Sequence, residues 1–374
     1  MTLKGSCTGS GDQQDFSKQT ILRNDGPTND LMAVSANSKK VIIEGFTLIN
    51  TTQNTMKDAT GMDASTDTGG SLTLKNCGFR ISDKGLDITG NSGKMLIYNT
   101  LFADGGTGLA EADNRTTVVN ATFANNTTAD MTGTANVYNS VSWNNTDQYL
   151  PTGNNNVSIA GTVANDNVNK GPNFVDPLND TKEKRDYRIR PSVQLLNKGN
   201  NNLYLNHVVK VVADANATAI PATEVDLGNN ARLVDNAIDV GAYEYEAPLQ
   251  PIVYVKADLT GTADGKSWET ALGDLQGAVD LAGLYALDHE TANGYVFVHG
   301  NYHNTGSINL TLGNTKVYGG MNDERSDEAL KDDFSNVNAV VNSLLGKRKG
   351  MLEATNHSSL GTVTISADGV IDGF

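Results

Sequence analysis

Apolar and polar residues alternate in four aligned stretches, which begin at Ser71, Lys94, Arg115 and Thr134. In each stretch the positions two and four residues before a shared Asn are mostly apolar, and the positions between them are mostly polar. Since a strand sends alternate side chains to opposite faces, this period of two predicts half-buried β-strands. The 3.6-residue rhythm of helical repeats is not found in these stretches.

The shared Asn recurs at spacings of 23, 21 and 19 residues, as Asn76, Asn99, Asn120 and Asn139. Three places further on, the first three stretches carry Phe79, Phe102 and Phe123. A period of about 20 residues is typical of a solenoid, in which equivalent residues stack about 4.8 Å apart. We therefore predict a ladder of left-handed Asn residues with amide hydrogen bonds between neighbours, beside a column of Phe. The alternative, that each Asn only marks an exposed turn, does not account for the aligned Phe.

The repeat extends in both directions. Gly45 takes the Asn place 31 residues before Asn76, and Gly161 takes it 22 residues after Asn139. We predict an all-β fold of the right-handed parallel β-helix type, a solenoid with two tandem modules that are both incomplete.

After residue 171 the repeat gives way to three motifs in order: Phe174-Val175-Asp176-Pro177, Asp186-Tyr187-Arg188-Ile189-Arg190 and Asp239-Val240-Gly241-Ala242-Tyr243-Glu244. This order resembles the closing segment of bacterial right-handed parallel β-helix repeat proteins of the pectate-lyase-like superfamily, where the last motif is a terminal strand. The chain departs from that pattern at residues 193–197. The resemblance implies the fold and a secreted or cell-surface location, and it implies no particular activity.

The Pro-rich run at residues 247–251 predicts a stiff hinge between two domains. Residues 1–247 are then the C-terminal part of a first β-helix, closed by residues 171–247. Residues 248–374 are the N-terminal cap and first strands of a second β-helix.

The second module opens with a predicted amphipathic helix over about residues 269–284. Its apolar face is formed by Trp268, Leu272, Leu275, Val279 and Ala282. The helix is expected to cover the end of that module. Because residues 370–374 resemble residues 42–46, we expect the chain to be a fragment of a longer array, with Met1 not necessarily its true start.

Composition narrows the range of partners. A formal charge of -15 and a pI near 4.7 argue against nucleic acid. No apolar run is long enough to span a membrane, and the first residues show no signal peptide. Cys7 and Cys77 provide no disulfide framework, and Cys77 is expected to be a buried thiol. We expect a monomer.

Candidate chemistry is sparse. Polysaccharide lyases and glycosidases place several carboxylates at one outward register, but the outward places beside the Asn ladder hold Lys75, Tyr98, Val119 and Tyr138. The sequence therefore predicts no catalytic residues and no metal centre. His299 and His303 are interpreted as part of a polar turn rather than a zinc site. The loop acids could recruit Ca²⁺ only weakly, and these are Asp83, Asp87, Asp104 and Asp113.

Outward aromatic residues on stiff strands suit contact with sugar rings or a protein surface. Tyr98, Tyr138 and Trp143 are the predicted ligand-binding residues. The preferred hypothesis is an adhesin-like surface protein that contacts polysaccharide or a host surface without catalysis. Two alternatives stay open, a polysaccharide lyase or glycoside hydrolase and a structural spacer.

Overall fold

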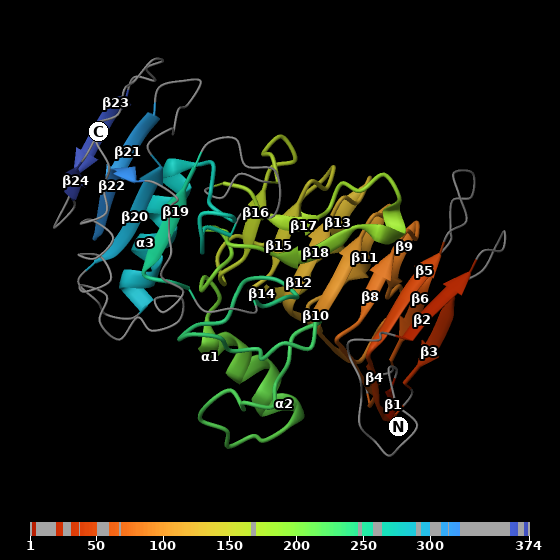
Figure 1. Cartoon of the computed structure of the whole chain (residues 1–374). Helices are drawn as coiled ribbons and strands as arrows, with labels where there is room; N and C mark the ends of the chain where they lie inside the picture. The colour runs from red at the N-terminus through yellow and green to blue at the C-terminus, as the bar shows by residue number, and fades with distance from the viewer. Residues whose placement is uncertain are drawn as a thin grey trace. The chain divides into compact units, whose positions relative to one another are not determined.

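The structure is a computed structural model of the 374-residue chain. It describes residues 2–4, 20–24, 31–36, 38–50, 60–66, 69–165, 170–245, 249–256, 264–288, 293–299, 308–312, 314–321, 360–365 and 370–372. The described chain is mostly β, with parallel sheets and few helices (Figure 1). It forms two compact units: the first is Met1–Asp166, Phe174–Ile189 and Gln194–Glu246, and the second is Asn167–Asn173, Arg190–Val193 and Ala247–Phe374.

The first unit contains an 11-stranded sheet in which strands of successive repeats pair in parallel. Its strands are β1 (Thr2–Lys4), β2 (Thr20–Asn24), β4 (Lys40–Glu44), β5 (Phe46–Asn50), β7 (Ser71–Lys75), β8 (Gly78–Arg80), β10 (Lys94–Ala103), β12 (Thr116–Ala124), β14 (Asn136–Tyr138), β15 (Val141–Trp143) and β16 (Val157–Ile159). A second, 5-stranded sheet of the same unit comprises β3 (Met32–Ser35), β6 (Thr60–Ser65), β9 (Lys84–Asp87), β11 (Thr107–Ala112) and β13 (Ala129–Gly133).

The predicted columns are present. Phe102 pairs in register with Phe79 and with Phe123, and its ring stacks on theirs with centroids 5.2 and 4.9 Å apart. Inward residues of the strands, such as Leu74 and Ile97, form one buried core with the Phe column. Burying such aromatic and aliphatic side chains supplies the main driving force that keeps the repeats stacked.

The two Gly predictions have different outcomes. Gly45 is left-handed, with φ 79°, and lies opposite Asn76, as predicted. The prediction for Gly161 is wrong, because β16 pairs with β15 rather than with β14. Asn139 donates its backbone N–H to the carbonyl of Asn154. Residues 154–156 therefore occupy, in the next repeat, the position that Asn139 and its neighbours occupy in theirs. The repeat is shorter here.

The chain after the repeats forms an antiparallel pair and a short helical stretch. The pair is β17 (Phe174–Asp176) and β18 (Asp186–Ile189), and the helical elements are η1 (Lys182–Lys184), α1 (Asn201–Tyr204), the π-helical turn η2 (Leu205–Val209) and α2 (Lys210–Val212). The expected terminal strand at residues 239–244 is not formed. These residues run as an irregular segment that exchanges hydrogen bonds with β12 and donates one to Asn139, the residue that follows β14.

The second unit contains two parallel sheets and one long helix. Its elements are β19 (Ile252–Val255), β20 (Gly294–His299), β22 (Thr315–Met321) and β24 (Val370–Asp372), then β21 (Ile308–Leu312) and β23 (Leu360–Ile365), and α3 (Leu275–Asp288). The helix packs its apolar side chains on β19, β20 and β22. It begins later than predicted because Leu272 exchanges backbone hydrogen bonds with Tyr254 and Lys256 in and beside β19, which a helical residue could not do.

Candidate functional site

The ladder Asn residues stand at one corner of successive repeats, here called the first corner (Asn76, Asn99, Asn120 and Asn139). Their φ angles are 50°, 49°, 51° and 49°, all left-handed. Asn adopts this conformation more readily than other residues with a Cβ. All are buried, so the predicted ladder is confirmed in its backbone.

The amides of the first corner mostly bind a later part of the chain rather than each other. The predicted bond between neighbours is present from Nδ2 of Asn139 to Oδ1 of Asn120, at 3.3 Å. Nδ2 of Asn120 instead donates to the carbonyl of Asp239 at 2.8 Å, and Nδ2 of Asn99 to that of Val225 at 2.8 Å. The first corner is therefore a line of hydrogen-bonding groups on which residues 195–245, here called the covering segment, are held.

A second left-handed corner lies five residues further along each repeat and was not predicted. Asp104, Asn125 and Asn144 have φ angles of 66°, 56° and 52°. Nδ2 of Asn144 donates to Oδ1 of Asn125 at 2.6 Å. The repeated Asn pairs at 125–126 and 144–145 are the signal that could have revealed this corner.

Asp104 fastens the β17–β18 pair to the second corner. Its fully buried carboxylate accepts hydrogen bonds from Arg185 at 2.6 Å, from Arg80 at 3.0 Å and from the hydroxyl of Tyr187 at 2.6 Å. Burial, together with this neighbouring carboxylate, raises the pKa of Tyr187 well above its usual value. Asp104 is thus a structural anchor, with its charge balanced inside the chain.

The helical part of the covering segment packs on the outer face of the large sheet. Outward side chains of β10 and β12 meet apolar side chains of α1 and η2 in a buried cluster, and α1 and α2 lie beside these strands in Figure 1. Its buried members are Leu96, Tyr98, Val119, Tyr204, Leu205, Val208, Val209 and Ile238. The alternation of residues in the sequence predicts that this outer face is exposed. In the structure, a later stretch of the same chain partly covers it.

This cover changes the interpretation of the predicted ligand-binding aromatics. Tyr98 is only 2% exposed and meets Tyr204 edge-on, and Trp143 is 2% exposed against Phe174. The expectation that both rings are exposed is wrong, because residues some distance along the chain cover them. Tyr138 is half-buried and stacks on His207, with ring centroids 4.1 Å apart.

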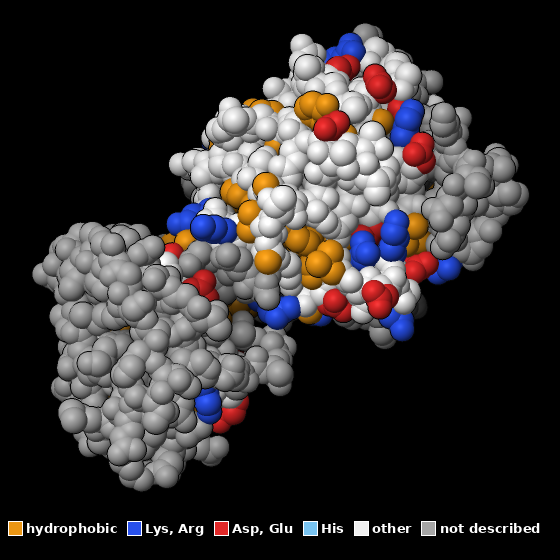
Figure 2. All heavy atoms as spheres, turned by 90° about the horizontal axis from the view of Figure 1, so that it is seen from above, with side chains coloured by type: hydrophobic (Ala, Val, Ile, Leu, Met, Phe, Trp, Pro, Cys, Tyr) orange, Lys and Arg blue, Asp and Glu red, His pale blue; other side chains and the backbone are white. Residues whose placement is uncertain are grey.

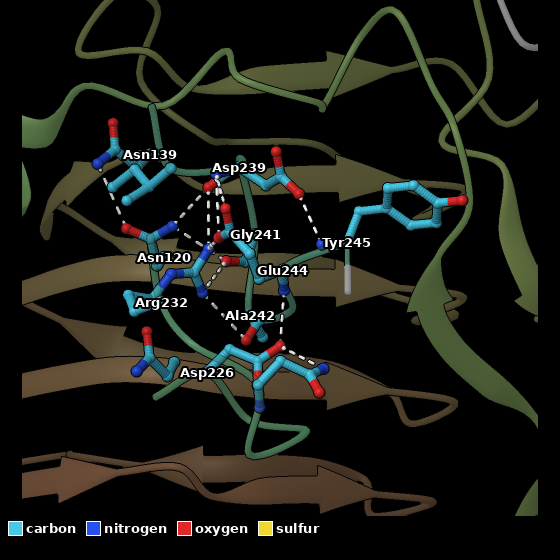
Figure 3. Close-up of polar contacts among 12 residues, drawn as sticks. Asn120, Asn139, Asp226, Arg232, Asp239, Gly241, Ala242, Glu244 and Tyr245 are labelled. Carbon is cyan, nitrogen blue, oxygen red and sulfur yellow. Dashed lines mark hydrogen bonds and ion pairs between the residues drawn. The ribbon is translucent and has the colours of Figure 1, made fainter. Parts of the chain in front are cut away.

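Figure 3 shows a second polar centre, buried inside the covering segment. Arg232 is fully buried and forms an ion pair with Glu244. The carboxylate of Asp239 accepts backbone N–H groups of Asn197 and Tyr245, each at 2.7 Å. These contacts tie both ends of the covering segment together.

Burial raises the pKa values of the carboxyl groups in this centre. It raises the pKa of Asp239 to about 7 and that of Glu244 well above its usual value, although Arg232 opposes both shifts. Such carboxyl groups resemble those of acid–base catalysts. The side chains of Arg232 and Glu244 have no exposed surface, however, so we interpret the centre as structural.

The other candidate ligand residues do not converge. Lys84 binds Asp87, and Arg115 binds Asp113, so these carboxylates already have cationic partners. In the part of the chain that the structure describes, no group of three or more His, Cys, Asp or Glu side chains is arranged to hold a metal ion. His299 lies at the end of β20, and His303 is outside the described residues. The free thiol of Cys77 is buried, as predicted, whereas Cys7 is outside the described residues.

A groove remains open beside the covering segment, with a volume of about 530 Å³. Its floor is the outer face of β4, β7, β10 and β12, and one wall is formed by η2 and α2. The lining residues are Lys40, Ser71, Leu72, Thr73, Lys94, Met95, Leu96, Asn114, Arg115, Thr117, His207, Val211 and Val212. This set combines hydroxyl, amide and cationic groups with aliphatic surface, and it contains neither Asp nor Glu.

His207 sits where the groove wall is π-helical, a geometry often found at functional sites. Burial lowers the pKa of His207 below its usual value. The lowered pKa favours the neutral ring, which can both donate and accept a hydrogen bond.

Charged side chains are distributed differently elsewhere. On the face drawn in Figure 2, acidic and basic side chains lie interspersed, with apolar patches between them. The lining residues of the groove, by contrast, include basic side chains and no acidic ones.

Comparison of the chain with family models, with curated proteins and with solved structures finds no match. Among the described residues, no helix is both long and apolar enough to cross a membrane. The groove is therefore the feature of the molecule from which a function can be inferred.

Proposed function

We propose that this chain belongs to a secreted or cell-surface protein of the right-handed parallel β-helix type, which contacts carbohydrate through the groove without catalysing a reaction. The parallel in-register pairing of successive repeats and the left-handed corners support this fold. The likeness of residues 174–244 to the closing segment of pectate-lyase-like repeat proteins supports the location.

The observation that carries the proposal is the composition of the groove. Hydroxyl groups of Ser71, Thr73 and Thr117 alternate with aliphatic surface from Leu96 and Val212. Sugar rings present hydroxyl groups at their edges and C–H groups on their faces, so they need this mixture of partners. Glycoside hydrolysis requires a pair of carboxyl groups beside the sugar, and the groove lining provides none.

The test is to incubate the purified full chain with a panel of neutral and acidic polysaccharides and to measure both binding and turnover. Affinity electrophoresis reports binding, and release of reducing ends or unsaturated uronates reports turnover. We expect retardation by at least one polysaccharide and no product. Product formation would refute the non-catalytic role in favour of a lyase or hydrolase, and a chain that binds no glycan would leave the spacer hypothesis.

A further inference from the structure

Cationic side chains form a row along the floor of the groove. Lys40 pairs in register with Ser71, and Ser71 pairs with Lys94. The pairing of Met95 with Thr116 puts Lys94 level with Arg115 on the next strand. Since neighbouring strands lie about 4.8 Å apart, these side chains follow one another across the strands in a single line.

Each cation of the row is presented to solvent. Lys40, Lys94 and Arg115 are exposed, and all line the groove. Arg115 is held by its ion pair with Asp113 and by a hydrogen bond to the carbonyl of Asn91, at 2.7 Å. Asp113 balances part of the positive charge of Arg115, whereas the groove lining itself contains basic side chains and no acidic ones.

A second row runs parallel to the first, one outward position further along the strands. Thr73 pairs with Leu96, and Leu96 pairs with Thr117. Across the groove stands the wall that carries His207 and the 60% exposed Val211. The groove thus offers charge along one side and a mixed hydroxyl and aliphatic surface along the other.

We propose that the groove binds a linear anionic glycan whose chain runs across the strands. Its carboxylate or sulfate groups would face Lys40, Lys94 and Arg115, and its ring hydroxyls would face Thr73 and Thr117. This inference rests on the proposed function and names the class of sugar that it recognises. Charge-assisted hydrogen bonds to such anionic groups are stronger than those between neutral partners.

Other polyanions fit the groove less well. Single-stranded nucleic acid is held by stacking of bases on aromatic side chains, and the lining contains no Phe, Tyr or Trp. Acidic motifs of peptides are bound by clusters of Arg, and the groove lining holds a single Arg, Arg115; peptides are also bound by addition to a strand edge. The strands of the groove floor are paired on both sides, as β7 is with β4 and β10.

The test compares the wild-type chain with the double variant Lys40→Gln/Lys94→Gln in isothermal titration calorimetry. The probes are heparin for sulfate, polygalacturonate for carboxylate and dextran as a neutral glycan. Lys184→Gln, an exposed lysine that is not part of the groove lining, is the matched control. Circular dichroism and thermal melting verify that the variants fold.

We expect at least one acidic polysaccharide to bind, with affinity about tenfold lower in the double variant, unchanged in the control and reduced by added salt. The preference between heparin and polygalacturonate distinguishes sulfate from carboxylate. If only neutral glycans bind, the anionic inference is overturned while the proposed function stands. If no glycan binds, both fail. Equal binding of polyglutamate or single-stranded DNA would overturn the inference in favour of unspecific polyanion binding.

Discussion

Nδ2 of Asn139 donates a hydrogen bond to Oδ1 of Asn120 at 3.3 Å, and Asn120 in turn donates to the carbonyls of Asp239 and Gly241 at 2.8 and 3.1 Å. The ladder therefore joins two levels of structure. One Asn links adjacent repeats, and the next links the repeats to a segment more than a hundred residues further along the chain.

Replacing Asn120 by Ala and by Gly separates the contribution of its side-chain hydrogen bonds from that of its left-handed backbone. Asn120→Ala removes buried hydrogen bonds and puts a Cβ residue with little αL preference at φ 51°. We expect a loss of about 2–4 kcal/mol in the free energy of unfolding. Asn120→Gly keeps the favoured backbone conformation and should cost about 1 kcal/mol less. Urea denaturation measures both, with the exposed Asn202→Ala as control. Equal losses for the Ala and Gly variants would contradict the role of the left-handed backbone.

The Phe column predicts a different sensitivity. Phe102 stacks on a Phe above and below and has no exposed surface. Phe102→Ala should cost about 3–5 kcal/mol because it leaves a cavity between two rings, and Phe102→Leu should cost less. Tyr149→Ala, at a side chain that is 55% exposed, should change stability little. A small effect of Phe102→Ala in thermal or urea unfolding would show that the rings do not stack.

The thiol of Cys77 should be inert in the folded protein. Burial raises its pKa to about 12, so the reactive thiolate is scarce at pH 8. In a Cys7→Ser variant, where Cys77 is the remaining cysteine, we expect no reaction with Ellman's reagent until guanidinium chloride is added. Rapid labelling of the native variant would mean that the core around Cys77 opens readily.

The buried Asp239 predicts a pH dependence of stability. Its pKa is about 7 when folded, against about 3.9 for an unperturbed Asp. A carboxyl group with a raised pKa stabilises the fold fully below the unfolded value, and this contribution is lost as the pH rises towards 7. The wild-type free energy of unfolding should therefore fall between pH 4 and pH 7, by up to about 1.4 kcal/mol per pH unit, relative to Asp239→Asn.

Urea unfolding at pH 4 to pH 8 measures this difference. The amide introduced by Asp239→Asn cannot titrate but accepts fewer N–H groups than the carboxylate, so the variant also carries a constant loss of stability. Asp147→Asn, at an exposed position, is the control and should follow the wild-type slope. Parallel curves for wild type and Asp239→Asn would contradict the assigned titration.

The sequence predicted those features in which the same residue type recurs. Asn76 and Phe79 have matching residues one period later, so the first corner and the Phe column could be recognised. The second corner was missed because its occupants differ in type, with Asp104 where the next repeats have Asn125 and Asn144.

Contacts between distant parts of the chain could not be predicted from the periodicity of the sequence. Tyr98 points outward, as the alternation indicates, but Tyr204 covers it from a segment that has no repeat relation to it. The charge row of the groove was visible in principle, since Lys94 and Arg115 begin aligned stretches. Its significance depended on knowing that η2 and α2 form the opposite wall.

The covering segment also bears on how the first unit comes apart. In a simple repeat protein each unit contacts only its neighbours, so the terminal units can fray one after another. Here Val225, Asp239 and Asn200 are hydrogen-bonded to three successive rungs at Asn99, Asn120 and Asn139. The covering segment therefore cross-links these three repeats. Under a pulling force they should unfold together in one event rather than one repeat at a time.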